Sequence, residues 1–302
     1  MLFNSLRRRR VPHNVSAFVI ATLLAPYAAG AQIPAIYPVP SGARARITAT
    51  NVVLGAAIGA IRAWSTHRSV RRGLLLGAGG GLTTALGRQI TATGGLYAGA
   101  LGRTIHDAGL GIGSAVVDSQ FTLPLHVGPL VARWTPAARR WPLVKVNLTN
   151  LLFATVTAAQ PNSRIDWGAT LWSGAVAIRP RNPLAVGIDE TASAAPGTIR
   201  LVPVSEICRF RPSGVELCRV DLAHETLHIQ QLDMVHEWIG RPIEDAAIPR
   251  RLRQHRVFQH LELGLVGVMS VVGFERFRAY ETRWSEHEAS WLTSGRGPLP
   301  NP

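Results

Sequence analysis

The spacing of apolar and polar residues divides the chain into regions, and the first of these combines apolar side chains with many Gly and Ala residues. Residues 51–117 contain runs such as Leu54-Gly55-Ala56-Ala57-Ile58-Gly59. Small residues at this density let helices approach one another closely. No stretch reaches about 18 apolar residues without an interrupting Arg, His or Asp, which disfavours a membrane-spanning helix. We therefore expect closely packed short helices here, with association with a membrane surface as an open alternative.

From residue 118 the pattern changes to the alternation that is typical of strands. Val144-Lys145-Val146-Asn147-Leu148-Thr149 alternates clearly, and Pro and Gly separate the segments. This alternation predicts an antiparallel sheet, too small to close an outer-membrane barrel, which takes at least about eight strands. The expected strands cover residues 121–130, 143–156, 166–178 and 198–204, with a further strand over 215–220.

The last hundred residues have mainly helical spacing. Asp221 is a candidate N-cap, and apolar residues recur after it until Gly240. The apolar run from Leu261 to Phe274 is too short to cross a bilayer and predicts a buried helix. The whole pattern predicts an α+β fold with a Gly/Ala-rich helical segment, an antiparallel sheet and a helical C-terminal part. The expected divisions are 1–31, 32–117, 118–220 and 221–302.

The first 31 residues have the features of a secretory signal peptide. Four arginines at positions 7–10 precede an apolar run from Val15 to Ala25, and Ala29-Gly30-Ala31 forms a cleavage site. A retained membrane anchor is the alternative. We expect an exported chain in the periplasm or cell envelope. Cys208 and Cys218 are the only two cysteines, and in an oxidising compartment they would close a hairpin by a disulfide.

The charge pattern argues against nucleic acid as a partner. The net charge is +14, from 31 arginines and the single lysine Lys145 against 18 acidic residues. The arginines are scattered along the chain, and they form no basic stripe with interleaved aromatic residues. An anionic membrane surface remains compatible with this charge.

The main chemical motif is His224-Glu225-Thr226-Leu227-His228, an H-E-x-x-H pentapeptide. Residues four apart share a helix face, so His224 and His228 could hold one Zn²⁺ per chain. Glu225 would then act as general base toward a metal-activated water. The metzincin continuation is excluded because Gln231 and Met234 stand where that class has Gly and His. A pair of ordinary helix histidines is the alternative interpretation.

A third ligand would have to come from another part of the chain. Glu286-His287-Glu288-Ala289-Ser290 resembles the E-x-x-A-D segment of the membrane-associated gluzincins that include the HtpX and Ste24 type proteases. That resemblance implies Glu286 as the third ligand, and Ser290 departs from the family's Asp. Glu288 and Glu281 are the backup ligands, and Tyr280 is a candidate oxyanion donor, although a buried aromatic role is the alternative. Glu286 could also be an ordinary surface charge.

These residues predict an exported zinc metallopeptidase that hydrolyses peptide bonds in a peptide or protein substrate. The competing hypothesis is a non-catalytic envelope or membrane-associated protein with a relic or purely metal-binding motif. A zinc hydrolase that acts on another amide, such as one in the cell wall, is a third option. The sequence indicates neither the cleavage preference nor the oligomeric state.

Overall fold

The structure is a computed structural model that describes residues 41–95, 97–118, 120–138, 141–160, 163–180, 192–201, 214–265 and 284–294, all within one unit, Pro34–Pro302. The predicted signal peptide, Cys208, Tyr280 and Glu281 lie outside these residues. For Cys218 and Glu286 the backbone is described but the side chain is not. The predicted disulfide therefore stays a prediction.

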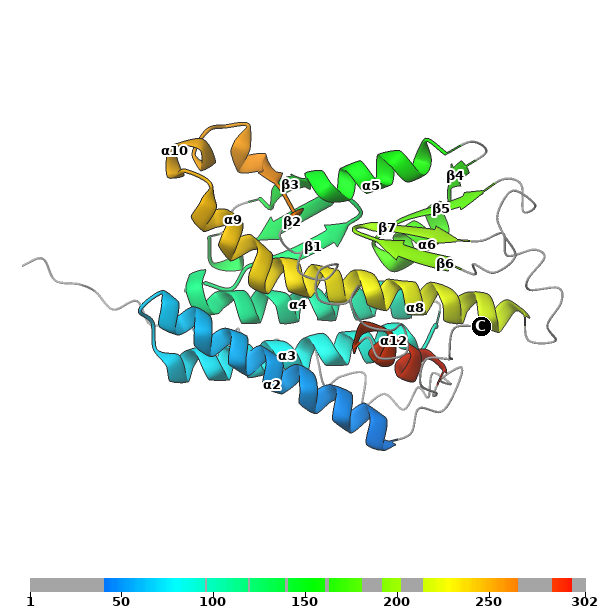
Figure 1. Cartoon of the computed structure of the whole chain (residues 1–302), viewed down its shortest axis with the longest axis horizontal. Coiled ribbons are helices and arrows are strands. Elements are labelled where there is room, and N and C mark those ends of the chain that lie inside the picture. The colour runs from blue at the N-terminus through cyan, green and yellow to red at the C-terminus, as the bar shows by residue number, and fades with distance from the viewer. Residues whose placement is uncertain are drawn as a thin grey trace, which may run out of the picture. The chain divides into compact units, whose positions relative to one another are not determined.

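Three long helices rich in Gly and Ala form the first part of the described chain (Figure 1). They are α2 (Ser41–Ser65), α3 (Val70–Ala92) and α4 (Ala98–Asp118), and α3 packs against both of the others. A β-carbon on Gly55 would collide with the Gly77 carbonyl oxygen, and one on Gly87 would collide with the backbone of His106. The predicted close packing is confirmed, but the helices have 25, 23 and 21 residues and are not short.

One described helical stretch meets the criteria of length and composition for crossing a membrane. It is Gly42–Ser65 of α2, and 28% of its apolar window is buried. The core helix of a water-soluble protein and a signal sequence meet the same criteria.

The middle of the chain forms two small mixed sheets. The first has the order β1-β2-β3-β8, and the second has the order β4-β5-β7-β6. Antiparallel pairing dominates, but β3 pairs with β8 and β5 pairs with β7 in parallel, so the prediction of a wholly antiparallel sheet is wrong. The strands are β1 (Leu123–Val127), β2 (Leu130–Trp134), β3 (Leu143–Asn147), β4 (Ser163–Ile165), β5 (Val176–Pro180), β6 (Ala192–Ala195), β7 (Thr198–Leu201) and β8 (Leu261–Glu262).

Two of the predicted strands turn into helices part-way along. The strand predicted over 143–156 ends at Asn147, whose side chain accepts a hydrogen bond from the backbone N–H of Asn150 and caps α5 (Leu148–Ala158). The strand predicted over 166–178 begins with α6 (Trp167–Ser173), which Asp166 caps in the same way. Gly174 ends α6 in the left-handed conformation. Side-chain capping therefore overrides the apolar pattern at both positions. Between β2 and β3 lies the short 3₁₀ turn η1 (Pro136–Ala138).

Helix α8 (Gly214–Val235) packs against other elements on several sides. Ile229 joins the apolar cluster of β5 and β7. Leu227 packs with Ala92 of α3 and with Ala289 of α12 (Trp284–Ser294), and Met234 packs with Leu110 of α4. The H-E-x-x-H motif therefore lies on a helix that the surrounding core holds in place.

The start of α8 corrects two predictions. Residues 215–220 form its first turns, so the strand predicted there is wrong, and Asp221 lies inside the helix and is not its N-cap. The division expected at residue 220 accordingly falls within α8.

The helix continues beyond α8 into a π-helical turn, η3 (His236–Gly240), and then into α9 (Arg241–Ala247). Two short elements follow, α10 (Arg250–Arg253) and the 3₁₀ turn η4 (Phe258–His260). Residues 261–262 form β8, so the predicted helix does not begin at Leu261. The coarse α+β class is confirmed.

Candidate metal centre on helix α8

The two histidines of the motif meet at their Nε2 atoms. His228 Nε2 lies 3.1 Å from His224 Nε2, and the rings stand edge to face with centroids 4.7 Å apart. Two zinc–nitrogen bonds of about 2.0–2.1 Å at a tetrahedral angle would hold two nitrogens about 3.3 Å apart. Both imidazoles are half-buried, whereas Leu227 and Ile229 beside them are fully buried. The pair therefore fits two corners of a zinc site.

Gln231 fixes the orientation of the His228 ring. His228 Nδ1 lies 3.0 Å from Gln231 Oε1, and Gln231 Nε2 donates to Glu288 Oε2 at 2.9 Å. Because the amide nitrogen faces the carboxylate, the amide oxygen faces the imidazole and must accept a proton from Nδ1. A neutral His228 then carries its lone pair on Nε2, the atom that points toward His224. A second hydrogen-bonding group of this kind is what orients most histidine ligands of metals.

Glu288 is held by a buried polar chain that reaches back to the Gly-rich helices. Its carboxylate forms an ion pair with Arg88 of α3 at 2.9 Å and accepts from Asn51 Nδ2 of α2 at 3.0 Å. Arg88 also donates to Asn51. Arg88 is fully buried and Glu288 is 2% exposed. The predicted backup ligand therefore has both oxygens engaged by nitrogen donors and supports Gln231.

Helix α12, which carries Glu286 and Glu288, packs against α8 at the level of the motif. Ala289 and Leu292 of α12 pack with Leu227 of α8. The predicted second helix beside the motif helix is thus present. The Glu286 side chain lies outside the described part of the chain.

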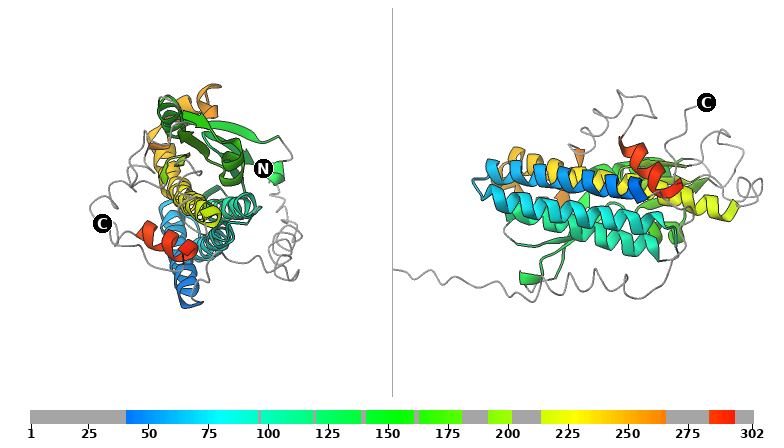
Figure 2. Two further views of the ribbon diagram at one scale, coloured as in Figure 1. Left: turned by 90° about the vertical axis from the view of Figure 1, so that its right-hand side faces the viewer. Right: turned by 90° about the horizontal axis from the view of Figure 1, so that it is seen from below.

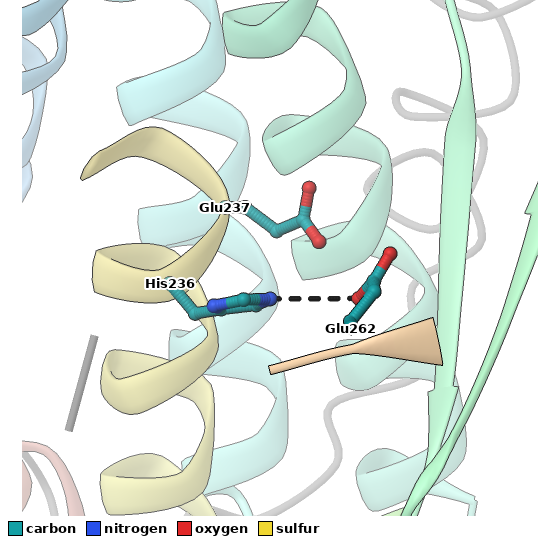
Figure 3. Close-up of side chains that lie close together, drawn as sticks. All are labelled: His236, Glu237 and Glu262. Carbon is teal, nitrogen blue, oxygen red and sulfur yellow. Dashed lines mark hydrogen bonds and ion pairs between the residues drawn. The ribbon is translucent and has the colours of Figure 1, made fainter. Parts of the chain in front are cut away.

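A second group of potential ligands begins directly after α8. His236 and Glu237 of η3 and Glu262 of β8 each offer one atom, and these atoms lie within 4.8 Å of one another (Figure 3). His236 Nε2 is 3.5 Å from Glu262 Oε2, and all three residues are buried. Sequence reasoning missed this group because β8 brings Glu262 to η3 only in the folded chain.

Arginines already neutralise this second group. Arg133 of β2 binds Glu237 with both terminal nitrogens and donates from Nε to Glu262 at 2.7 Å. Arg241 pairs with Glu237 at 3.2 Å, and Lys145 pairs with Glu262 at 3.4 Å. A divalent cation would add positive charge beside three basic side chains, so the group is a poor metal site.

The pKa shifts in this group agree with its ion pairs. Burial alone would raise the pKa of Glu237 and of Glu262, but the Arg133 guanidinium lowers both below their ordinary range. Burial alone would lower the pKa of His236, yet its hydrogen bond to Glu262 and the nearby carboxylates raise it. The carboxylates of Glu237 and Glu262 are therefore charged at neutral pH, and the ion pairs favour the charged form of His236.

The buried ion pairs extend from this group to α4. His126 of β1 bonds Asp107 at 3.2 Å and lies 3.6 Å from Glu237. Arg103 bridges Asp107 and Asp233 of α8. The network thus links α4, β1, β2, η3 and β8 through charge.

The structure thus brings together two of the predicted metal ligands, His224 and His228. Glu225 is buried beside them at 9% exposure. Sequence reasoning missed Gln231, Arg88 and Asn51 as supports. Gln231 lies three residues after His228 on the same helix face, and this spacing could have indicated from the sequence that it contacts His228.

Comparisons with protein-family models, with curated proteins and with solved structures found no match for this chain.

Proposed function

We propose that the chain is an exported zinc-dependent metallopeptidase of gluzincin type, with His224 and His228 as metal ligands. The observation that carries the proposal is the 3.1 Å separation of their Nε2 atoms, together with the turn of His228 Nδ1 toward Gln231. Ordinary helix histidines have no need of both features, whereas a pair of neutral ligands does.

The remaining roles follow from position. Glu286 on α12 is the proposed third ligand, with Glu281 as an alternative. The carboxylate of Glu288 already binds Arg88 and Asn51, so we propose that it supports Gln231 instead of binding the metal. Bound zinc would acidify a water molecule and polarise the scissile carbonyl. Glu225 would accept the proton of that water, and Tyr280 would donate to the oxyanion.

A non-catalytic role is the second candidate, because the same contact between the imidazoles is compatible with it. The 3.1 Å contact between the imidazoles is also an acceptable hydrogen bond between one protonated and one unprotonated nitrogen. In that case the motif would need no metal. The two candidates predict different zinc contents and different effects on cleavage when Glu225 is replaced.

The test is metal analysis of the purified full chain combined with cleavage of an unfolded, fluorescently labelled protein. The proposal predicts about one zinc per wild-type chain, and zinc retention without cleavage in Glu225→Gln, because that variant lacks only the base. Glu286→Ala should lose zinc. His255→Gln, which changes an exposed histidine far along the chain from the motif, is the control and should match wild type.

Two results would overturn the proposal. A wild-type chain refolded with excess Zn²⁺ that retains none would remove the metal site. Zinc retention with no cleavage above background by wild type would remove the catalytic role and leave the non-catalytic candidate.

A further inference from the structure

The end of the helical hairpin at which α2 turns into α3 exposes apolar side chains among arginines. Trp64 is 73% exposed, Ile61 61% and Leu75 66%. Every residue from 64 to 72 is exposed, including the three arginines at positions 68, 71 and 72. None of these arginines forms an ion pair with a described residue. Large apolar side chains gathered with unpaired charge mark an interaction surface.

A second segment of the same character lies at the same end of the unit. All residues from 251 to 260 are exposed, and Val257 and Phe258 stand among Arg251, Arg253 and Arg256. Figures 1 and 2 show the α2–α3 turn and α10 at one end of the long helices. We call residues 61–75 and 251–258 together the basic end.

Two ion pairs and one hydrogen bond link the two segments through the ends of neighbouring helices. Arg253 pairs with Asp245 of α9 at 3.6 Å. Arg241, also of α9, pairs with Asp118 at the end of α4 at 3.0 Å. Arg62, near the end of α2, donates to the Gly113 carbonyl of α4 at 3.4 Å. These contacts connect the two segments through α9 and α4.

The sequence around the hairpin determines which sign of charge a partner of this surface must carry. The first 106 residues contain no Asp or Glu at all. A second copy of the basic end, or the arginines at positions 7–10, would meet it with like charge and be repelled. The complementary partner is anionic.

We propose that the basic end binds the surface of a bilayer that contains anionic phospholipids. The arginines would contact phosphate groups, and Trp64 would lie at the boundary between headgroups and acyl chains, where its apolar ring and polar N–H are both satisfied. Ile61, Leu75 and Val257 would enter the apolar edge of that boundary. Nucleic acid fits less well, because aliphatic side chains have no stacking role there.

The experiment is flotation of the full chain with vesicles of phosphatidylcholine alone and with phosphatidylcholine plus about one-third phosphatidylglycerol. We expect binding only to the anionic vesicles, weakened by salt. Each exposed arginine near such a surface contributes roughly fivefold to binding, so Arg71→Gln/Arg72→Gln should lose on the order of 25-fold. Trp64→Ser should lose the part of binding that persists at high salt.

Arg44→Gln/Arg46→Gln is the matched control. It removes the same charge from exposed positions near the opposite end of α2, so it should bind nearly as well as wild type. Arg251→Gln/Arg256→Gln tests the second segment independently. Circular dichroism checks that each of these variants is folded.

The proposal would be overturned by equal binding to neutral vesicles, or by equal losses in the Arg71/Arg72 and Arg44/Arg46 variants, which would mean diffuse charge attraction. Binding to DNA in preference to anionic vesicles would also overturn it and assign the surface to nucleic acid. None of these results depends on zinc or on catalysis, so they separate this proposal from the peptidase proposal.

Discussion

Two groups of histidine and acidic side chains follow one another along a single continuous helix, and they differ in what surrounds them. His224 and His228 on α8 are half-buried, and the neighbour that holds His228 is the neutral amide of Gln231. His236 and Glu237 on η3 are fully enclosed, with Arg133 and Arg241 against the carboxylate. In the first group two imidazole Nε2 atoms lie 3.1 Å apart, whereas the carboxylates of the second group are already paired with arginines.

The difference shows why residue type alone does not define a metal site. The η3 group has three potential ligand atoms within 4.8 Å, and the described part of the α8 group has only two imidazoles. Yet the basic side chains around the η3 group supply the positive charge that a metal would supply. The η3 group therefore has a structural role, and the difference is consistent with the metal site that we propose on α8.

The largest expected effect comes from removing the cation of the buried group. Arg133→Met would leave Glu237 with Arg241 and Glu262 with Lys145, and removing one partner of a buried ion pair costs about 3–5 kcal/mol of stability. Urea unfolding measures this loss. Arg164→Met, at an exposed strand position, is the control and should change stability by less than about 0.5 kcal/mol. A stability equal to wild type in Arg133→Met would show that the network carries no net stability.

A smaller effect is expected at alkaline pH through His126. Burial disfavours its charged form, but the carboxylates of Asp233 and Asp107 raise its pKa to about 10. A raised pKa stabilises the fold fully below the unfolded value of about 6.5, and this contribution is lost as the pH rises toward 10. The free energy of unfolding should therefore fall between about pH 7.5 and 10, and less steeply in His126→Gln.

His106 is the matched control for that pH profile. Burial lowers its pKa to about 4, so it is neutral in the folded chain throughout the alkaline range. His106→Gln should keep the alkaline slope of wild type even if it lowers stability overall. Parallel profiles for wild type and His126→Gln would contradict a charged His126 in the network.

The smallest expected effect sharpens the role assigned to Gln231. Gln231→Leu removes the acceptor of His228 Nδ1 and should weaken zinc binding about 10–100-fold, because groups that orient a histidine ligand contribute on that scale. Gln230→Leu is the control: Gln230 is equally buried on the same helix but donates to Thr91. Zinc titration with a competing chelator measures both. Equal affinities in the two variants would leave Gln231 with a packing role only.

The features that were predicted from the sequence are those with short-range physical causes. Gly55 and Gly59 on α2, spaced one turn apart, predict close helix packing, and α3 provides the matching glycines. His224 and His228 share a face because they are four residues apart. The apolar alternation did not predict α5 and α6, because the capping side chains of Asn147 and Asp166 start a helix inside each predicted strand.

The features that were missed depend on long-range contacts. Arg88 and Glu288 are 200 residues apart, and Arg133 and Glu262 are 129 apart. With 31 arginines in the chain, composition does not tell which few are buried and paired. The identity of the helix that supports Gln231 follows only from the packing of α12 against α8 and α3.

The central claim is that metal binds to the first of the two groups and not to the second. Zinc stoichiometry of three full-length chains tests it most directly: wild type, His228→Ala and His236→Ala, each compared at equal folded fraction. The account predicts about one zinc in wild type and in His236→Ala, and none in His228→Ala. Zinc that is retained in His228→Ala but lost from His236→Ala would contradict it.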